Sequence, residues 1–472
     1  MIMDLDRQHT VKQLLLLVIL VGVLQACHKG FLDAKPSTNL EVPTTLNDFQ
    51  AILDNTTVFG LVPTLGEASA DNYFFTYPYW LTLDTREKNA YVWAVDIFQG
   101  QGGQQDWNTP YQQVFYANVV LDGLGSKPGP DSVAQWNALE GAALFLRAFA
   151  FYNIAQVFAP AYDTSLLNVP LGIPLRLHAD INTPSTRSTI GQTYQQIIQD
   201  LDSAELFLPS GEPNAYRNRP IRLAAQAMLA RVYLSMRSYS QARAYADSAL
   251  LAYSALIDYN TLDTTMGEPI SLLNAETLYQ ASFLSGAVGS TPYLLALAGG
   301  FYPSTRIDTG LMQSYDPNDL RRVIYYNYKP PDLSDLKGSY ANSFVPFGGL
   351  ATDELYLIRA EGAARAKDAI SAMADIDTLL SKRWRTGTFP GYIVGSWQEA
   401  LDTVLLERRK ELAFRGLRWT DLRRLNAEGA NDTLIRNLNG TLYTLAPNSD
   451  LYVLPIPPDV ISLSTIAQNV RD

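Results

Sequence analysis

The sequence predicts an all-α fold in which tetratricopeptide-like helical hairpins form the scaffold and a long loop-rich insertion interrupts it. Residues 222–250 predict the first hairpin, because small and aromatic residues recur there at tetratricopeptide spacing, at Leu229, Ala230, Tyr233, Tyr239, Ala242 and Ala249. The same spacing returns at Ala360, Ala372 and Leu379, which predicts a second hairpin. Between them, residues from about 254 to 349 lack helical periodicity and are rich in Pro, Gly, Asp and Tyr. A loop region of this length inside a domain is usually functional.

Apolar residues at helical spacing predict further helices before the first hairpin. One follows Thr45, which can cap it, and is expected to bury Leu46, Phe49, Ile52 and Leu53. Another begins at about Asp106 and is expected to bury Tyr111, Val114, Phe115, Val119 and Leu121. Residues 134–158 predict a third helix, and residues 183–209 predict a fourth that Ser188 can cap.

The N-terminus predicts a lipoprotein. A short apolar run, Leu14 to Leu24, precedes Ala26 and the single cysteine of the chain, Cys27. Such a run suits a signal peptide and is too short for a stable membrane-spanning helix. We therefore expect a signal peptide over 1–26, a membrane anchor through lipidated Cys27, an extended tether over 27–44, and one helical domain over 45–472. The alternatives are an ordinary cysteine beside a generic signal peptide, or an uncleaved anchor.

Composition excludes several classes of function. A net charge of −11 argues against nucleic acid or an anionic membrane surface as a partner. The histidines are His9, His28 and His178, so a His-rich zinc site cannot be built, and a Ser-His-Asp site would need His28 or His178. We expect His178, which follows a Pro-rich stretch, to be a surface loop residue. No phosphate-binding Gly-rich loop is present. We predict no catalytic residue, metal or cofactor.

The segment 70–93 is the strongest candidate for ligand binding. It is dense in aromatic residues, fits neither a helical nor a strand period, and contains Pro78, which is expected to break any helix. Sugars stack their C–H faces on aromatic rings while polar side chains bond the hydroxyl groups. This chemistry is offered by Asp71, Asn72, Tyr73, Tyr77, Tyr79, Trp80 and Trp93, and secondarily by Tyr302, Tyr326, Tyr328 and Tyr340. The competing interpretation is that these aromatic residues pack helix interfaces.

The stretch 405–426 carries a dense lattice of charges. Glu407 and Glu411 lie one helical turn apart and could form a metal or acid–base pair. The interspersed arginines favour a structural interpretation instead, because guanidinium groups keep carboxylates ionised and pair with them in networks.

Motifs along most of the chain together resemble the SusD/RagB family of outer-membrane lipoproteins. They are Phe31-Leu32-Asp33 after Cys27, the run Leu146–Tyr152, Tyr194…Asp200-Leu201, Glu354…Arg359-Ala360-Glu361, the pattern Glu407-Arg408…Trp419…Asp421-Leu422, and Leu454-Pro455-Ile456-Pro457. Two positions depart from the family pattern. Arg415 stands where Glu is commonest, and the tail after Pro457 lacks the usual Asn-Pro.

The resemblance implies a non-enzymatic, surface-exposed protein, lipid-anchored in the outer membrane. Such a protein captures an oligosaccharide and delivers it to a SusC-like TonB-dependent transporter. The resemblance also implies tetratricopeptide-like helix pairs beneath a loop-rich face, but the family has no fixed ligand-binding motif to carry over. Two alternatives stay open. One is capture of a peptide, and the other is a surface glycoside hydrolase with two carboxylates.

Overall fold

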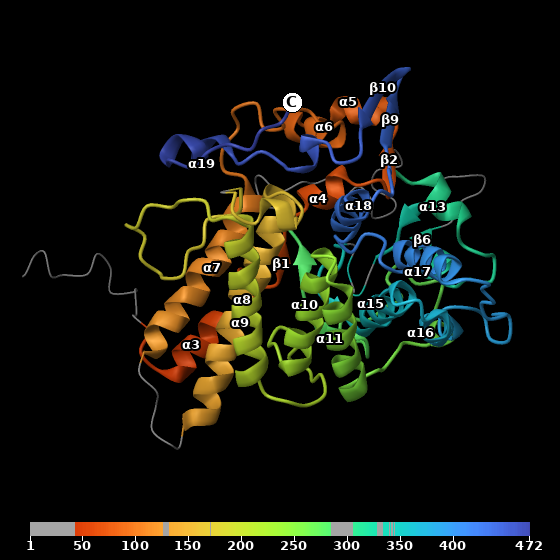
Figure 1. Cartoon of the computed structure of the whole chain (residues 1–472), viewed down its shortest axis with the longest axis horizontal. Helices are drawn as coiled ribbons and strands as arrows, with labels where there is room; N and C mark the ends of the chain where they lie inside the picture. Colours follow the sequence, from red (N-terminus) through yellow and green to blue (C-terminus); the bar gives the residue numbers. More distant parts are fainter. Residues whose placement is uncertain are drawn as a thin grey trace, which may run out of the picture. The chain divides into compact units, whose positions relative to one another are not determined.

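The helices of the scaffold form a row in which each packs against the next (Figure 1). In order they are α7 (Gln105–Leu124), α8 (Val133–Phe158), α9 (Ile190–Phe207), α10 (Arg222–Ser235), α11 (Tyr239–Ala252), α15 (Thr352–Arg365), α16 (Ala369–Ser381) and α17 (Trp397–Glu411). Both predicted hairpins are confirmed, as α10–α11 and α15–α16. The insertion leaves the row after α11 and returns at α15, yet these two helices are direct neighbours.

This structure is a computed structural model that describes residues 43–125, 132–169, 171–284, 305–327, 334–338, 340, 343 and 345–472. The signal peptide, Cys27 and nearly all of the tether lie outside the described residues, as do Tyr302 and Tyr328. Residues Thr45–Asp472 form one unit. Within the described part, α8 is long and apolar enough to cross a membrane, but 89% of its most apolar stretch is buried inside the protein, as in a core helix.

Small residues allow α11 and α15 to approach closely. Ala242, Ala246 and Ala249 of α11 are fully buried. On the facing helix, a Cβ atom added to Gly362 would lie 2.6 Å from the Cβ of Arg243 and 3.1 Å from the carbonyl oxygen of Tyr239. The tetratricopeptide-like spacing in the sequence therefore reflects a steric requirement, since larger side chains would force the two hairpins apart.

Shorter elements lie around the row of helices. Before it come α3 (Leu46–Leu53), β1 (Leu61–Val62), α4 (Leu65–Ser69), β2 (Tyr73–Phe75), α5 (Tyr77–Thr82) and α6 (Thr85–Tyr91), and η2 (Thr164–Leu166) follows α8. The insertion contributes η3 (Tyr259–Thr261), β3 (Thr277–Tyr279), β4 (Ser282–Phe283), β5 (Thr305–Ile307), α13 (Thr309–Gln313), α14 (Arg321–Ile324), β6 (Tyr326–Asn327) and β7 (Asp335–Leu336), and β8 (Leu350–Ala351) precedes α15. After α17 come α18 (Arg418–Asn426), β9 (Leu434–Leu438), β10 (Thr441–Leu445), η4 (Asp450–Tyr452) and α19 (Pro458–Leu463).

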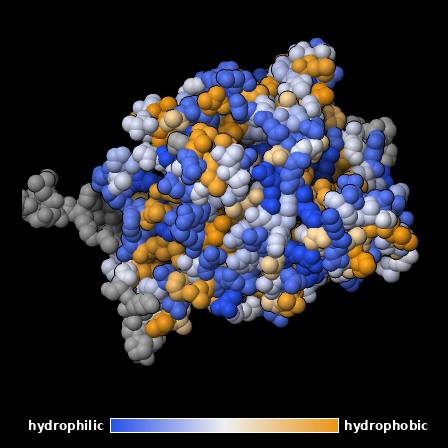
Figure 2. Space-filling view, viewed as in Figure 1, coloured by the Kyte–Doolittle hydropathy of each residue, from blue (hydrophilic) through white to orange (hydrophobic). Residues whose placement is uncertain are grey.

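Short strand pairs attach the insertion to the N-terminal part of the domain. β1 pairs in parallel with β4, and β2 pairs antiparallel with β5. Within and beside the insertion, β3 pairs with β8 and β6 with β7, both antiparallel, while β9 and β10 form a hairpin of their own. Ile435 and Leu442 of this hairpin are exposed, and Figure 2 shows hydrophobic (orange) atoms at the upper right, where Figure 1 places β9 and β10.

Two helix predictions need correction. The N-cap of α9 is Thr189, not Ser188, because the Thr189 side chain accepts the N–H of Gln192 in a capping box. In α7, Val114, Ala117 and Val120 face the core, whereas Phe115 lies on another side of the helix and is exposed. The prediction that Thr45 caps α3 is confirmed.

Replacing Gly362 by Ala is expected to lower the free energy of unfolding by about 1–3 kcal/mol, because the new methyl group overlaps α11. Urea denaturation followed by circular dichroism measures the change. Gly267→Ala is the matched control, since its Cβ would meet no atom within 4 Å and the substitution should leave stability nearly unchanged. Equal effects of the two substitutions would contradict the role assigned to close packing.

Candidate ligand-binding site

Arg436 supports the aromatic segment from beneath. This buried side chain of β9 lies against the rings of Tyr73, Tyr91 and Trp93, with 5.4, 4.2 and 5.2 Å from its Cζ atom to the ring centroids. Its guanidinium also donates to the carbonyl oxygens of Tyr73 (2.6 Å) and Ala70 (2.5 Å). Cation–π attraction and hydrogen bonds therefore fix the backbone of β2 and the aromatic rings around it.

Tyr77, Tyr79 and Trp80 form the outer side of the segment and are half-buried. We call these three residues the aromatic platform. The rings of Tyr77 and Trp80 stack at 6.0 Å with an interplanar angle of 23°, and Tyr79 packs edge-on against Phe75 at 5.4 Å. The indole N–H of Trp80 donates to the carbonyl oxygen of Lys88 at 3.4 Å. The platform thus presents partly exposed rings, and contacts with Phe75 and with the carbonyl oxygen of Lys88 fix the orientation of Tyr79 and Trp80.

Pro78 begins a helix here, contrary to the expectation that it would break one. It lies in the first turn of α5, where a backbone N–H has no intrahelical partner and the fixed φ of proline suits the helix. This short helix carries all three platform residues on one turn and a half.

The β2–β5 pairing connects the aromatic segment to the insertion. Tyr73 pairs with Ile307, and Phe75 pairs with Thr305. Tyr302 precedes β5 by three residues but lies outside the described residues, as does Tyr328. The pairing therefore joins the aromatic segment to Thr305–Ile307 of the insertion, a strand that contains none of the predicted site residues.

Asp71 forms ion pairs with Arg418 and Arg409. Arg418 donates to its two carboxylate oxygens at 2.7 and 2.9 Å, and Arg409 donates to it at 3.2 Å. Burial by itself raises the pKa of Asp71, but the hydrogen bonds and charge of Arg418, with Arg409, outweigh it and hold the pKa well below its usual range. Asp71 therefore fixes α17 and α18 to the base of the aromatic segment.

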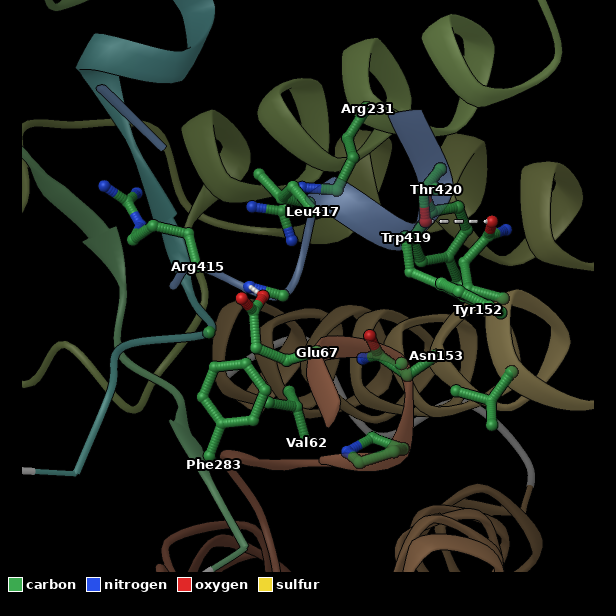
Figure 3. A pocket seen from close by; sticks show the side chains of 16 residues that line it. Val62, Glu67, Tyr152, Asn153, Arg231, Phe283, Arg415, Leu417, Trp419 and Thr420 are labelled. Atoms are coloured by element: carbon green, nitrogen blue, oxygen red, sulfur yellow. Dashed lines mark hydrogen bonds between the residues drawn. The ribbon is translucent and has the colours of Figure 1, made fainter. Parts of the chain in front are cut away.

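Asn72 is buried and bonded to Glu67, a residue that lines a small polar cavity of about 30 Å³ (Figure 3). Its amide donates to Glu67 at 2.7 Å, and the other Glu67 oxygen accepts the N–H of Gly416 at 3.1 Å. In Figure 3 the Glu67 side chain enters the cavity from one side, opposite Arg231 and Leu417. Burial raises the pKa of Glu67 to about 7, although both hydrogen bonds lower it. A cavity of this volume and polarity can hold water.

Most of the other predicted site residues are buried and make structural contacts. Tyr73 donates to the carbonyl oxygen of Ala68 at 2.7 Å, and Trp93 to that of Ser69 at 2.9 Å. Tyr340 donates to Glu276, and the hydroxyl of Tyr326 lies 3.1 Å from that of Tyr315. Burial keeps these side chains, and Asn72, from the surface that a ligand can touch. Direct ligand contact therefore remains a prediction mainly for Tyr77, Tyr79 and Trp80.

Glu407 and Glu411 are paired in a structural network, as predicted, but their arginine partners are Arg321 and Arg383 from outside the stretch and not the interspersed arginines. Arg321 donates to Glu407 at 2.6 Å and to Glu411 at 2.9 Å, and all three side chains are fully buried. Three carboxylates, Glu276, Asp353 and Glu411, have oxygens within 4.8 Å of one another. Arg383 bridges Glu276 and Glu411, and Arg415 pairs with Asp353 at 2.9 Å. These buried carboxylates face guanidinium groups rather than an open cleft that could admit a polysaccharide.

Arg436 was missed by the sequence analysis, although the pattern contained a signal. In Leu434–Leu438 every second residue faces inward, namely Leu434, Arg436 and Leu438. An arginine on the inward side of a period-2 strand requires buried partners. The sequence could therefore have indicated a buried cation in β9, but not which rings surround it.

Comparisons with known proteins place most of the chain in one family. Residues 30–234 match the family described as "Starch-binding associating with outer membrane", and residues 352–470 match the one described as "SusD family". SusD-like protein P2 of Formosa agariphila is 23% identical over 419 residues, which cover 77% of this chain and 79% of that protein.

Solved structures share the fold. A SusD superfamily protein of Bacteroides thetaiotaomicron superposes with a TM-score of 0.72 at 21% identity, covering 90% of this chain and all of the other. A laminarin-binding SusD-like protein superposes with a TM-score of 0.63 at 17% identity, covering 91% of this chain and 99% of its own. The all-α, tetratricopeptide-like scaffold is thus common to these proteins.

Replacing Glu67 by Gln is expected to remove a pH dependence of stability. Because the folded-state pKa is raised, the un-ionised carboxyl stabilises the fold fully below the unfolded value of 4.5, and this contribution is lost as pH rises through about 7. Urea unfolding between pH 4.5 and 8 should show wild-type stability falling by up to about 3 kcal/mol relative to the variant. The exposed Glu212→Gln is the control, and parallel pH curves for wild type and Glu67→Gln would contradict the raised pKa.

Proposed function

We propose, since this chain belongs to the SusD family, that it captures an oligosaccharide at the outer membrane and delivers it to a SusC-like TonB-dependent transporter. Carbohydrate is the ligand class that the family description and the laminarin-binding structural neighbour support. The structural observation that carries the proposal is the aromatic platform, in which Tyr77 and Trp80 stack with partly exposed rings. A sugar ring can lay its apolar face on such a surface.

A binding role fits the buried state of the carboxylates better than a catalytic one. A glycosidase needs two carboxyl groups that flank the scissile bond in an accessible cleft. The cluster of Glu276, Asp353 and Glu411 is buried and neutralised by Arg383 and Arg415. Incubating the purified protein with starch and laminarin tests this point, and release of shorter sugars would overturn the binding-only proposal.

Trp80→Ala should weaken glycan binding about fivefold or more, because stacking on one indole contributes about 1 kcal/mol. Isothermal titration with laminarin-derived and starch-derived hexasaccharides measures the change. Tyr216→Ala, another exposed aromatic residue, is the matched control and should bind as wild type. Unchanged affinity in Trp80→Ala would exclude the platform, and binding of peptides in place of glycans would favour the alternative ligand class.

We also propose that Cys27 carries the lipid anchor and that the domain is exposed at the cell surface. The proposal rests on the apolar run before Cys27 and on the outer-membrane description of the matching family. Several acyl chains on one residue provide a durable anchor, whereas one chain binds only reversibly.

Cys27→Ala should move the protein from the membrane fraction to the soluble fraction and abolish labelling by a radioactive fatty acid. Fractionation of cells that express either form, with immunoblotting, gives the readout. Ser37→Ala, within the predicted tether, is the control and should remain in the membrane fraction. Membrane association of Cys27→Ala equal to wild type would show that the anchor lies elsewhere.

A further inference from the structure

A groove on the scaffold, formed by residues other than the aromatic platform, lies between α7 and α19. Its volume is about 420 Å³, within the range of small-molecule sites. Trp107, Tyr111 and Phe115 line one wall, at successive i, i+4 positions of α7, so that they form a row along one face of the helix. Val460 and Leu463 of α19 contribute to the opposite wall.

The aromatic row becomes more exposed along α7. Trp107 is 5% exposed, Tyr111 is half-buried and Phe115 is 37% exposed. Leu463 across the groove is 87% exposed. A large aromatic side chain left at the surface opposite another apolar residue provides a stacking surface for a ligand with an apolar face.

Hydrogen bonds hold the groove in a preformed shape. Asp459, at the start of α19, accepts the N–H of Gly103 at 2.8 Å, which ties this helix to the loop before α7. Tyr111 donates to the carbonyl oxygen of Pro174 at 3.0 Å, and Asn118 to that of Arg176 at 2.8 Å. A ligand would therefore bind without the entropic penalty of ordering the walls.

Two donors that line the groove have no partner. Neither the indole N–H of Trp107 nor the side-chain amide of Asn108 makes a hydrogen bond to any group in the described part of the chain. The Trp107 ring as a whole is buried, but its indole nitrogen is not enclosed, so water can accept its N–H until a ligand takes its place. The groove therefore combines apolar rings with two N–H donors, on Trp107 and Asn108, that can bond the oxygen atoms of a ligand.

The groove continues into the loop that follows α8 and η2. A second cavity of about 300 Å³ shares Pro174, Arg176, His178 and Ser185 with the first. The guanidinium of Arg176 is held by the carbonyl oxygens of Asp180 and Thr183 and by Ser185. The His178 side chain is 79% exposed, as the sequence predicted for a surface residue, and its Nδ1 lies 2.9 Å from Asp122. The two cavities therefore adjoin, and Arg176 and His178 already have partners, whereas one carboxylate oxygen of Asp459 in the groove is buried without one.

We infer that this groove is a second carbohydrate-binding site that accommodates a segment of a glycan chain. The inference rests on the proposed function. The rings of Tyr111 and Phe115 stack on sugar faces, and the donors of Trp107 and Asn108 bond ring or hydroxyl oxygens. An uncharged, hydroxyl-rich chain fits a groove in which Arg176 and His178 are paired within the protein, and its hydroxyl groups can donate to the unpaired oxygen of Asp459. Two sites on one molecule would raise the avidity for a chain long enough to occupy both.

The test compares Phe115→Ala and Asn108→Ala with Trp80→Ala, the wild type and the control Tyr216→Ala. Isothermal titration with laminarin-derived and starch-derived hexasaccharides gives affinity and stoichiometry, and circular dichroism confirms that each variant is folded. We expect two sites in the wild type, and a loss of threefold or more in affinity at one of them in both groove variants while the other site is kept.

Each outcome decides between the proposals. Groove variants that bind as wild type while Trp80→Ala loses affinity would overturn the inference and leave the proposed function standing. Loss of binding in the groove variants but not in Trp80→Ala would support the groove and remove the platform as a site. A wild-type protein that binds neither hexasaccharide would overturn both proposals.

Discussion

A buried network of ion pairs centred on α17 and α18 holds the separate parts of this domain together. Arg321, from the insertion, contacts Asp319, Glu407 and Glu411, and Arg383 links Glu411 to Glu276 of the insertion. Arg424 joins α18 to Glu361 of α15. Removing one member of such a network leaves an unpaired buried charge, which destabilises a protein by about 3–5 kcal/mol. The C-terminal signature is therefore the common attachment for hairpin, insertion and aromatic segment.

The charges of this network stabilise the fold and do not lie at the surface where a ligand would bind. Its charged side chains are buried and paired with one another, so they are not exposed to a ligand at the surface. Partly exposed aromatic rings occur instead at the platform on α5 and in the groove beside α7. These rings are the places at which the proposed stacking on a sugar would occur.

The scaffold could be predicted from the sequence because its constraints are local. The spacing of Ala230, Ala242 and Ala249 reports the packing of neighbouring helices, and Thr45 reports a helix start. The partners of Arg321 and Arg436 could not be predicted, since the contacts join residues far apart in the sequence, 86 positions for Arg321 and Glu407 and 363 for Arg436 and Tyr73. The burial of Tyr326 and Tyr340 was missed for the same reason: aromatic composition does not distinguish a ring in the core from one at the surface.

Arg436 has a consequence for how such a binding face can change over evolution. The partners of its guanidinium are rings and backbone carbonyl oxygens, and in the part of the chain that the structure describes no carboxylate pairs with it. Contacts of this kind, inside the protein, are weakly screened by salt. Backbone carbonyls do not depend on side-chain identity. Residues on α5 could therefore be exchanged while the contacts of Arg436 with the neighbouring backbone stay intact. The surface side chains of α5 could then vary while the backbone that carries them keeps its position.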